Sequence, residues 1–346
     1  MQKIKTALLS YGMSGKVFHA PFLTLHPGFE LIGAWERSKK LMQVDYPEAI
    51  NFPTLESVLE SEVALVVINT PTAHHYEHAK KVLLSGKHAI VEKAFTTTVA
   101  EAQELAAIAK EKGLKLAVFQ NRRWDSDFKT VKKVRDDGLL GDLIDAEFHF
   151  DRYTPALSPK AHKETVNPGA GIVKDLGSHL IDQALTLFGF PQAVNADIRI
   201  TREHSVVDDS LDINLFYPNL RVRLKAGYFN REMIPSFILQ GKQGSFFKQR
   251  GDVQEDQLKL NHKPNLSDWG TEADGFEGLV HTEIDGEVVR KNIPTLKGNY
   301  YDYFDGMYNA IANNTAEPVT AQDGIHVMQI IEAAMQSSKE KRRIEF

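Results

Sequence analysis

Short apolar runs alternate with segments of helical periodicity through about residue 120. Runs that are apolar throughout, such as Ala64–Ile68, suit parallel strands buried on both faces. This alternation predicts a doubly wound, mostly parallel sheet with helices between its strands. The expected strands are the start of Ile4–Leu23, Phe29–Trp35, Ala64–Ile68, His88–Val91 and Lys115–Phe119, and the expected helices are Gly15–Leu25, Leu55–Glu60, Tyr76–Ser85 and one that Thr96–Thr98 caps and that ends near Lys112.

The pattern changes from Asp127 onward. After a helix that ends near Asp137, a first alternating strand is followed by later segments of alternating apolar and polar residues that have no helices between them, which favours an antiparallel sheet. Its expected strands are Leu143–Phe150, Ala193–Thr201, Asp209–Phe216, Arg221–Tyr228 and Ser236–Gln240, and helices are expected near Tyr300–Ala312 and Asp323–Lys341. With a length of 346 residues, the chain is expected to be α/β with two domains, residues 1–121 with the parallel sheet and residues 122–346 of α+β type with a large, mostly antiparallel sheet. The terminal helices can pack back on the first domain.

Composition narrows the class of protein. Hydrophobic residues make up 42% and charged residues 25%, which is ordinary for globular proteins and argues against disorder. The net charge of −5, with acidic and basic residues interspersed, argues against a nucleic-acid binder. The chain has no cysteine, which excludes disulfides and thiolate chemistry, and it has no apolar run of membrane-spanning length. A cytoplasmic protein that binds neither nucleic acid nor membrane is expected.

The stretch Ile4–Leu23 reads as a strand, a tight turn and a helix. In the turn, Ser10, Gly12 and Gly15 form the pattern Ser-x-Gly-x-x-Gly, whereas the dinucleotide fingerprint is Gly-x-Gly-x-x-Gly. Small residues there allow backbone N–H groups at a helix N-terminus to face the pyrophosphate of a dinucleotide. A tight βα turn that binds nothing explains the same residues equally well at this point.

A charged loop follows the second strand, about 20 residues beyond the glycines. In a dinucleotide-binding fold, residues at this position contact the adenosine ribose. Glu36 alone would favour a free 2′-hydroxyl and therefore NAD, whereas Arg37, Ser38 and a nearby lysine suit a 2′-phosphate. The loop carries both kinds of residue, so we expect NADP to be preferred and NAD to be the second option. A solvated charged loop is the alternative interpretation.

Two polar segments follow buried strands at the carboxyl edge of the predicted sheet, where open α/β sheets bind ligands. The first is Asn69–His75, in which His74 and His75 are expected at the surface where a helix starts. The second is Glu92–Lys93, which places a lysine in position for chemistry. An ordinary loop lysine has the same sequence position, since a perturbed lysine needs burial or charged neighbours.

A glycine-rich stretch, residues 167–182, becomes helical and carries Asp175 and His179. At a spacing of four, an α-helix places both side chains on one face, so that the carboxylate can orient the imidazole or raise its basicity. Such a histidine suits proton transfer to or from an alcohol oxygen, and the alternative is a surface pair that adds a few tenths of a kcal/mol. No compact set of residues has zinc-ligand spacing, so no metal is expected.

Four motifs occur in order along the chain: Ser10–Gly15, Asn69–His75, Glu92–Lys93 and Asp175–His179. With them, the chain resembles the glucose-fructose oxidoreductase/inositol dehydrogenase (Gfo/Idh/MocA) family over essentially its full length. Within that family the chain is most similar to the bacterial NADP-type scyllo-inositol dehydrogenase branch, on the basis of GMSGKVFHAPF, VINTPTAHHYEHA, QNRRWDSDF and DLGSHLIDQALTLFG. The resemblance implies a Rossmann domain, an α+β substrate domain and hydride transfer between NAD(P) and a secondary alcohol of a cyclitol or sugar.

The resemblance also implies roles for individual residues. Lys93 would lie beside the nicotinamide and the substrate hydroxyl, His179 would transfer the proton, and Asp175 would contact the substrate beside it. The cofactor-binding residues that it implies are Ser10, Gly12, Met13, Ser14, Gly15, Lys16, Glu36, Arg37, Ser38, Asn69, Thr70, Pro71, His75, Glu92, Arg123 and Trp124.

Two residues depart from the family pattern. Ser10 replaces the usual first glycine, and Ala94 replaces the proline that usually follows the lysine. Because a cis bond before a non-proline residue costs about 2.5–4 kcal/mol, the Lys93–Ala94 bond is expected to be trans. Ala94 leaves a second hypothesis open, a cofactor-binding sensor or regulatory protein without catalysis. A third hypothesis is a reductase of another substrate class, such as an imine or a linear tetrapyrrole, on the same fold.

The predicted antiparallel sheet raises an expectation about assembly. Apolar residues alternate along two of its strands and share one face, which helices can cover: Leu211, Ile213, Leu215, Val222, Leu224 and Ala226. The other face is free for a second copy of the chain. A symmetric homodimer or a higher homo-oligomer is therefore expected.

Overall fold

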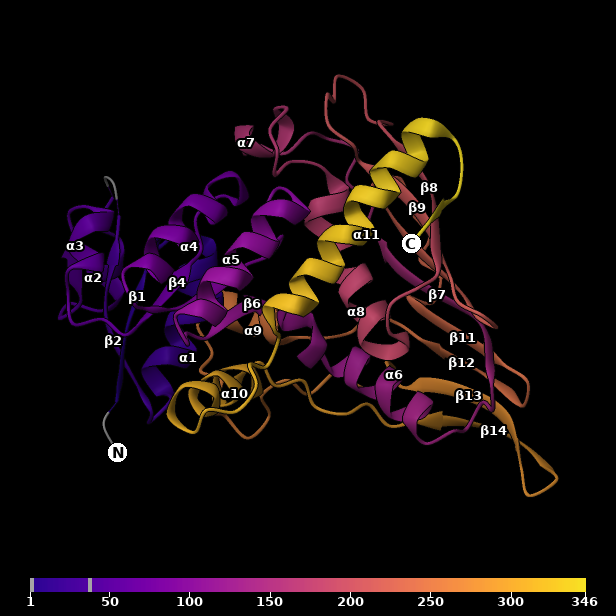
Figure 1. Ribbon diagram of the computed structural model, residues 1–346. Coiled ribbons are helices and arrows are strands. Elements are labelled where there is room, and N and C mark those ends of the chain that lie inside the picture. Colours follow the sequence, from indigo (N-terminus) through magenta and orange to yellow (C-terminus); the bar gives the residue numbers. More distant parts are fainter. Residues whose placement is uncertain (1–2, 37–38) are drawn as a thin grey trace. The chain divides into compact units, whose positions relative to one another are not determined.

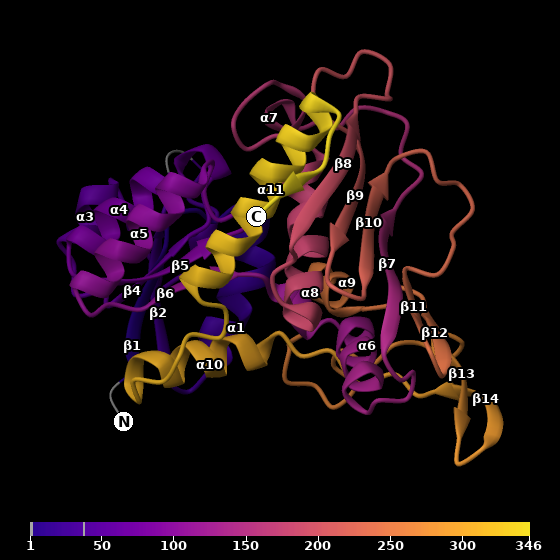
Figure 2. The same cartoon turned by 45° about the vertical axis from the view of Figure 1, so that its right-hand side comes forward.

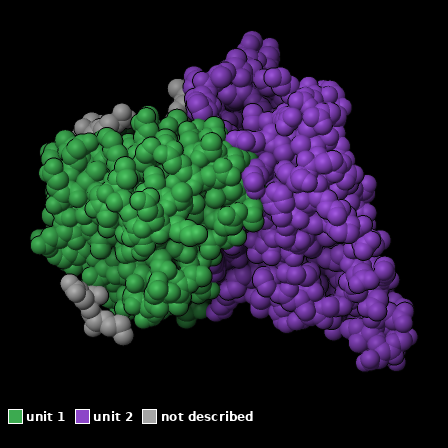
Figure 3. All heavy atoms as spheres, in the orientation of Figure 1, with its two compact units in different colours: residues 1–121, 254–269, 299–328 green, residues 122–253, 270–298, 329–346 purple. Residues whose placement is uncertain are grey.

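The computed structural model describes residues 3–36 and 39–346, apart from the side chains of residues 161 and 162. The chain forms two compact units, which are coloured separately in Figure 3. Unit 1 comprises residues 1–121, 254–269 and 299–328, and unit 2 comprises residues 122–253, 270–298 and 329–346.

Unit 1 is built on a six-stranded parallel sheet with the strand order β3-β2-β1-β4-β5-β6 (Figure 1). Its strands are β1 (Ile4–Leu8), β2 (Phe29–Trp35), β3 (Ile50–Phe52), β4 (Leu65–Ile68), β5 (His88–Glu92) and β6 (Leu116–Phe119). The helical segments are η1 (Gly15–His19), α1 (Ala20–Leu25), α2 (Met42–Asp45), α3 (Leu55–Leu59), η2 (Thr72–His74), α4 (His75–Leu84), α5 (Val99–Glu111), α9 (Gln254–Lys259) and α10 (Tyr301–Ala312). The doubly wound parallel sheet predicted from the sequence is confirmed.

The central strands of this sheet explain where a ligand can bind. All four residues of β4 are buried, and burial of each such side chain contributes about 1.5–3 kcal/mol. β4 pairs in parallel with β1, and the backbone N–H of Leu9, just beyond β1, donates to the carbonyl of Val67 at 2.9 Å. The turn after β1 and the loop after β4 therefore leave the sheet side by side at its carboxyl edge.

Segment 254–269 belongs to unit 1, although the sequence analysis assigned it to the second domain. The buried Gln254 holds it there, because Oε1 of Gln254 accepts hydrogen bonds from Nε1 of Trp269 at 3.1 Å and from the backbone N–H of Tyr300 at 2.7 Å. The Trp269 ring also packs edge-on against Phe22 of α1, with 6.2 Å between ring centroids. These contacts join segments far apart in the sequence, so no local pattern indicates them.

Unit 2 contains a nine-stranded sheet with the strand order β14-β13-β12-β11-β7-β10-β9-β8-β15 (Figure 2). β7 and β10 pair in parallel, and the other neighbouring strands are antiparallel, so the predicted mostly antiparallel sheet is confirmed. The strands are β7 (Leu143–Asp151), β8 (Ala193–Arg199), β9 (Ser210–Phe216), β10 (Arg221–Gly227), β11 (Phe237–Gly241), β12 (Gly244–Lys248), β13 (Gly278–Ile284), β14 (Glu287–Ile293) and β15 (Ile344–Glu345).

Helices cover one face of this second sheet. α8 packs against β7 and β10, and α6 packs against β12. The helical segments are α6 (Ser126–Asp136), α7 (Ala161–Glu164), η4 (Val173–Gly177) and α8 (Ser178–Phe188). Two elements cross from one unit to the other, η3 (Asn121–Trp124) and α11 (Ala321–Glu340). Within the described ranges, no helix has the length and apolar character that a membrane span requires.

Candidate functional site

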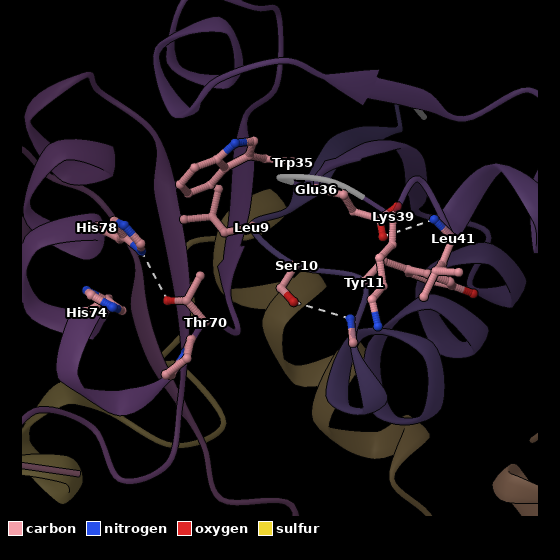
Figure 4. A pocket seen from close by; sticks show the side chains of 12 residues that line it. Leu9, Ser10, Tyr11, Trp35, Glu36, Lys39, Leu41, Thr70, His74 and His78 are labelled. Carbon is pink, nitrogen blue, oxygen red and sulfur yellow. Dashed lines mark hydrogen bonds between the residues drawn. The ribbon is translucent and has the colours of Figure 1, made fainter. Parts of the chain in front are cut away.

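A pocket of about 390 Å³ opens at the carboxyl edge of the parallel sheet of unit 1, beyond the ends of β1, β2 and β4 (Figure 4). Some of its lining residues were predicted from the sequence: Ser10, Gly12, Glu36, Thr70 and Pro71. Lys39 belongs to the charged loop in which a lysine was predicted to suit a 2′-phosphate, and His74 was predicted at the surface of the polar segment 69–75. The other lining residues were not predicted: Leu9, Tyr11, Trp35, Leu41 and His78. The pocket lies where open α/β sheets bind nucleotides.

The glycine-rich turn after β1 passes very close to itself. A Cβ atom on Gly15 would lie 2.4 Å from the carbonyl oxygen of Ser10 and 2.9 Å from Nδ2 of Asn69, so only glycine fits there. By contrast, a Cβ atom on Gly12 would meet Oγ of Ser10 at an ordinary 3.5 Å. The Ser10 hydroxyl accepts a hydrogen bond from the backbone N–H of Gly12 at 3.2 Å. Ser10 is therefore compatible with the turn and stabilises it.

Asn69 ties this turn to the loop after β4. Its Nδ2 donates to the Ser10 carbonyl at 2.7 Å, whereas its Oδ1 is buried and has no hydrogen-bond partner among the described residues. A ribose hydroxyl is the kind of donor that this oxygen lacks. Together with the close approach of the backbone at Gly15, the orphaned oxygen fits the site to a dinucleotide.

Lys16, in the first helical turn after the glycines, is engaged with α2. Its Nζ lies 2.8 Å from Oδ2 of Asp45, and the hydroxyl of Tyr11 donates to the same oxygen at 2.8 Å. The hydrogen bond from Lys16 lowers the pKa of Asp45, and burial followed by the bond to Asp45 raises the pKa of Tyr11. Met13, also predicted in this turn, is half exposed.

The carboxylate of Glu36 forms hydrogen bonds within the protein. It accepts hydrogen bonds from the backbone N–H groups of Leu41 at 3.0 Å and Met42 at 2.9 Å, which caps the start of α2. Lys39 of the same loop lines the pocket. Two residues predicted to contact a 2′-phosphate, Arg37 and Ser38, lie outside the described residues.

Aromatic and imidazole rings form one side of the pocket (Figure 4). His78 Nδ1 lies 3.0 Å from Oγ1 of Thr70, its ring stacks on His74 at 5.7 Å, and Trp35 meets it edge-on at 5.6 Å. Burial, reinforced by the charges of neighbouring histidines, lowers the pKa of His78 to about 4. The imidazole is therefore neutral at pH 7 and suits the edge of a flat heterocycle. The repeat of histidine at a spacing of four was the available sequence signal.

His75 is buried, contrary to the expectation of a surface residue, because both of its ring nitrogens meet backbone carbonyl groups. Nε2 lies 2.8 Å from the Thr70 oxygen and Nδ1 lies 2.9 Å from the Ala94 oxygen. Burial lowers the pKa of His75 more than these contacts raise it. The expectation of a trans bond before Ala94 was wrong: the Lys93–Ala94 bond is cis, in a segment where Ala94 is buried and its carbonyl contacts His75.

Glu92 links the end of β5 to the helix after the glycine-rich turn. Its carboxylate accepts a hydrogen bond from the Ser14 hydroxyl and lies 2.9 Å from Nε2 of His19. The backbone N–H of Lys93 donates to the same carboxylate at 3.2 Å. Burial raises the pKa of Glu92, but the contacts with His19 and Ser14 outweigh it and the net shift is downward. Lys93 thus follows an ionised, anchored residue.

The remaining predicted catalytic residues lie in unit 2. Asp175 lies in the π-helical turn η4 and His179 in the first turn of α8, so the regular α-helical spacing assumed from the sequence does not hold. Oδ2 of Asp175 accepts a hydrogen bond from Nζ of Lys163 at 2.8 Å, and His179 is 5% exposed. Lys93 belongs to unit 1, so the joint action of these three residues stays a prediction.

Two residues predicted to bind cofactor lie in η3. Nε and Nη2 of Arg123 donate to the two carboxylate oxygens of Asp182 at 2.9 and 2.7 Å, and Trp124 follows in the same short helix. This bidentate pair anchors η3 to α8, and a role of either residue toward cofactor stays a prediction. Among the residues that the structure describes, no group of three or more His, Cys, Asp or Glu side chains could hold a metal ion.

The parallel sheet and the pocket of unit 1 are typical of a dinucleotide-binding domain, and the comparisons with known proteins identify the family. Residues 4–120 match the oxidoreductase family model described as an NAD-binding Rossmann fold, and residues 132–346 match the model of the C-terminal alpha/beta domain of the same family. The chain therefore belongs to the Gfo/Idh/MocA oxidoreductase family, and the predictions of this family and of a nicotinamide-dependent enzyme are confirmed.

Individual relatives are similar over nearly their whole length. The chain is 37% identical to scyllo-inositol 2-dehydrogenase (NADP(+)) IolW of Bacillus subtilis, with 99% of this chain and 95% of that protein covered. A solved structure from Bacteroides fragilis is 42% identical, with a TM-score of 0.91 and complete coverage of both chains. The solved structure of yvaA from Bacillus subtilis is 37% identical, with a TM-score of 0.96, and covers 100% of this chain and 99% of that one.

Proposed function

We propose that the protein is a cytoplasmic, NADP-preferring dehydrogenase that acts on a secondary alcohol of a cyclitol or sugar. The observation that carries this proposal is the similarity to a scyllo-inositol 2-dehydrogenase (NADP(+)) at 37% identity over 99% of the chain. The site supports it, because the pocket at the carboxyl edge of the sheet and the close turn at Gly15 fit a dinucleotide.

The loop after β2 carries the residues that favour NADP over NAD. A carboxylate that faces the adenosine ribose favours a free 2′-hydroxyl, since it repels a 2′-phosphate. Here the carboxylate of Glu36 already accepts two backbone hydrogen bonds at the start of α2. Lys39 lines the pocket, and Arg37 and Ser38 precede it in the sequence. Cationic side chains beside an engaged carboxylate suit a phosphate.

The cofactor would be held by the turn and the loops that meet it. Gly12, Ser14 and Gly15 would surround the pyrophosphate, and Thr70 and Pro71 would line the path toward the nicotinamide. When bound, NADP supplies the acceptor for the hydride that leaves the carbinol carbon.

The side chains of the protein supply the proton chemistry in this proposal. His179 accepts the proton of the substrate hydroxyl, and the ammonium group of Lys93 donates a hydrogen bond to the same oxygen as negative charge develops there. Asp175, whose carboxylate pairs with Lys163, binds a neighbouring hydroxyl and orients the ring. Removal of the proton by a base makes loss of hydride from the same carbon easier.

Calorimetric titration of the full chain with NADP and with NAD tests the cofactor preference. We expect NADP to bind at least about ten-fold more tightly, which corresponds to about 1.4 kcal/mol. Lys39→Ala should lose a large part of this preference, whereas Lys110→Ala, which removes an exposed lysine of α5, should keep it. Equal affinity for the two cofactors, or tighter binding of NAD, contradicts the proposed preference.

We further propose that the second sheet supports a homo-oligomer. Its inward side chains on β9 and β10 are buried, whereas outward ones such as Arg221 and Arg223 are partly exposed and pair with Asp145 and Asp212. A two-fold axis over this face would bring the same charged pairs of two copies together. Light scattering tests this directly, and a monomer mass at assay concentrations contradicts it.

A further inference from the structure

Three arginine side chains of unit 2 converge on one aromatic ring. The guanidinium carbons of Arg122, Arg152 and Arg250 lie 5.5, 5.0 and 4.3 Å from the ring centroid of Phe150. They come from η3, from the segment just after β7 and from the segment just after β12. We call these three residues the arginine cluster. An aromatic face attracts each cation, but it does not cancel the repulsion among three of them.

Arg250 is the buried member of the cluster. Its Nη2 donates to the backbone carbonyl of His149 at 3.3 Å, and its guanidinium also lies over the ring of Phe237 at 4.7 Å. Its Nε and Nη1 are buried and have no hydrogen-bond partner among the described residues. Because a buried donor without an acceptor destabilises a fold, and more so when it is charged, these atoms indicate an acceptor other than the described residues.

Two aspartate carboxylates lie near the cluster, Asp125 and Asp127. Oδ2 of Asp125 accepts a hydrogen bond from Nη1 of Arg122 at 3.2 Å and lies 4.0 Å from Nη1 of Arg250. Oδ2 of Asp127 accepts from the backbone N–H groups of residues 251 and 252 at 2.9 and 3.2 Å. The Asp125 carboxylate is thus shared by two arginines of the cluster, and the Asp127 carboxylate is held by backbone N–H groups.

The pKa of Arg250 is lowered, chiefly by its burial. The charges of Asp127 and Asp125 oppose this lowering of the pKa, and those of Arg122 and Arg152 add to it. A bound anion would offset the cost of burying the positive charge of Arg250 and would reduce the repulsion among the three arginines.

The cluster shares its surroundings with the predicted catalytic carboxylate. Burial raises the pKa of Tyr228, the charge of Asp175 raises it further, and the charge of Arg152 lowers it. The backbone N–H of Arg152 donates to the carbonyl of Gly227, the last residue of β10, at 3.0 Å. The turn η4, which carries Asp175, packs against the same strand. Arg152 and Asp175 therefore both lie beside β10 in unit 2. A ligand whose hydroxyl contacts Asp175 can carry a second group toward the arginines.

We propose that the arginine cluster binds an anionic group, a carboxylate or a phosphate, of the ligand. This inference rests on the proposed dehydrogenase function and narrows its substrate class to acidic polyols, such as sugar acids and phosphorylated cyclitols or sugars. Guanidinium groups match both anions with paired N–H donors, and Nε and Nη1 of Arg250 are two donors of the cluster that lack an acceptor among the described residues.

Calorimetric titration of the full chain tests the proposal with two matched pairs of probes, D-glucuronate against D-glucose and myo-inositol 1-phosphate against myo-inositol. Each titration is made without cofactor and with NADPH, which cannot accept hydride from an alcohol. We expect at least one acidic probe to bind ten-fold or more tightly than its neutral counterpart. The pair that shows the difference distinguishes carboxylate from phosphate, and equal or absent binding of both acidic probes overturns the proposal.

Two variants locate the effect. Arg152→Gln changes an exposed side chain and should remove most of the preference for the acidic probe, and Arg250→Met keeps an unbranched chain over Phe150 while removing the charge. Arg199→Gln, at an exposed arginine of the same unit that pairs with Asp197, is the matched control and should keep the preference. If Arg250→Met does not fold, Arg152→Gln decides, and an unchanged preference in that variant contradicts the proposal. Binding of the acidic probes is also measured without cofactor. A failure of the dehydrogenase assay would therefore contradict the proposed function without deciding whether the arginine cluster binds anions.

Discussion

The carboxylate of Glu92 lies 2.9 Å from Nε2 of His19, which joins the end of β5 to the helix that follows the glycine-rich turn. Both side chains are buried or nearly so, at 13% and 0% exposure. The next residue after Glu92 is Lys93, the predicted hydrogen-bond donor to substrate. This pair therefore connects the cofactor turn of unit 1 to the lysine at the edge of the same sheet.

Replacing this carboxylate tests its structural contribution. Glu92→Gln should lower the free energy of unfolding at pH 7 by about 1–3 kcal/mol, because Gln removes the charge in contact with His19 and leaves a buried polar group poorly matched. Urea denaturation measures the difference. Glu111→Gln, at an exposed position of α5, is the matched control and should leave the midpoint unchanged.

The stability lost in Glu92→Gln should depend on pH in a defined direction. The pKa of Glu92 is lower in the folded chain than its ordinary value of 4.5, so the ionised carboxylate contributes stability above that pH. The contribution is lost as the pH falls below 4.5 and through the lowered pKa. The stability difference between wild type and Glu92→Gln should therefore shrink over this range, and a difference that stays constant contradicts the assignment.

Gly15 and Gly12 offer a matched pair in the turn. Gly15→Ala forces a Cβ atom against the Ser10 carbonyl at 2.4 Å, so we expect a loss of about 1–3 kcal/mol in stability and weaker cofactor binding. Gly12→Ala meets only the Ser10 hydroxyl at 3.5 Å and should keep the thermal midpoint of the wild type in the absence of NADP. Thermal unfolding with and without NADP measures both effects. Equal midpoints in the two variants would mean that the turn is not as close as described.

His78 gives the pocket a second pH response. Its pKa is about 4 in the folded chain against an ordinary value of 6.5, so unfolding takes up a proton and stability falls as the pH drops from 6.5 to about 4. Allowing for its partial exposure, we expect His78 to account for about 1–2 kcal/mol of this loss.

Replacing His78 shows how much of the change of stability with pH comes from this histidine. His78→Gln should flatten the stability profile over this range, although His75 also has a lowered pKa and keeps some of the slope. His204→Gln, at a histidine whose side chain is 83% exposed, is the control. A profile of His78→Gln that coincides with the wild type refutes the assignment.

Much of the fold was predictable from local sequence patterns. β2 begins and ends at the predicted residues, Phe29 and Trp35, because it is a mostly apolar run, interrupted only by Glu30, that ends where the charged loop starts. α5 starts at the predicted cap, since Thr98 and Glu101 form a capping box. The parallel pairing of β7 with β10 was not predictable, because alternation within a strand does not reveal its neighbour. β12, β13, β14 and β15 were also missed.

The candidate site was predictable where chemistry follows a short pattern. Ser10 and Thr70 line the pocket at the predicted edge of the sheet, since each lies two residues beyond the end of an apolar parallel strand. The burial of His75 could not be predicted, because it depends on the Ala94 carbonyl, which arrives from another strand. The capping role of Glu36 likewise depends on where α2 begins.

The predicted catalytic side chains make the most specific functional variants. Lys93→Ala and His179→Ala should each reduce turnover by about 10²–10⁴-fold, the usual contribution of a positioned acid or base, with NADP affinity retained. Steady-state assays and cofactor titration of the same preparations measure both. If the wild type binds NADP tightly but neither variant changes any measured rate, the sensor hypothesis replaces the enzyme.

Turnover of a polyol panel with the full chain is the most direct test of the central claim. The absorbance band of reduced nicotinamide is followed with NADP or NAD and with scyllo-inositol, other cyclitols, aldoses and their acidic counterparts, and with the keto forms in the reverse direction. The account predicts reduction of NADP with at least one of these alcohols, faster than reduction of NAD. No turnover of any of them with either cofactor contradicts it.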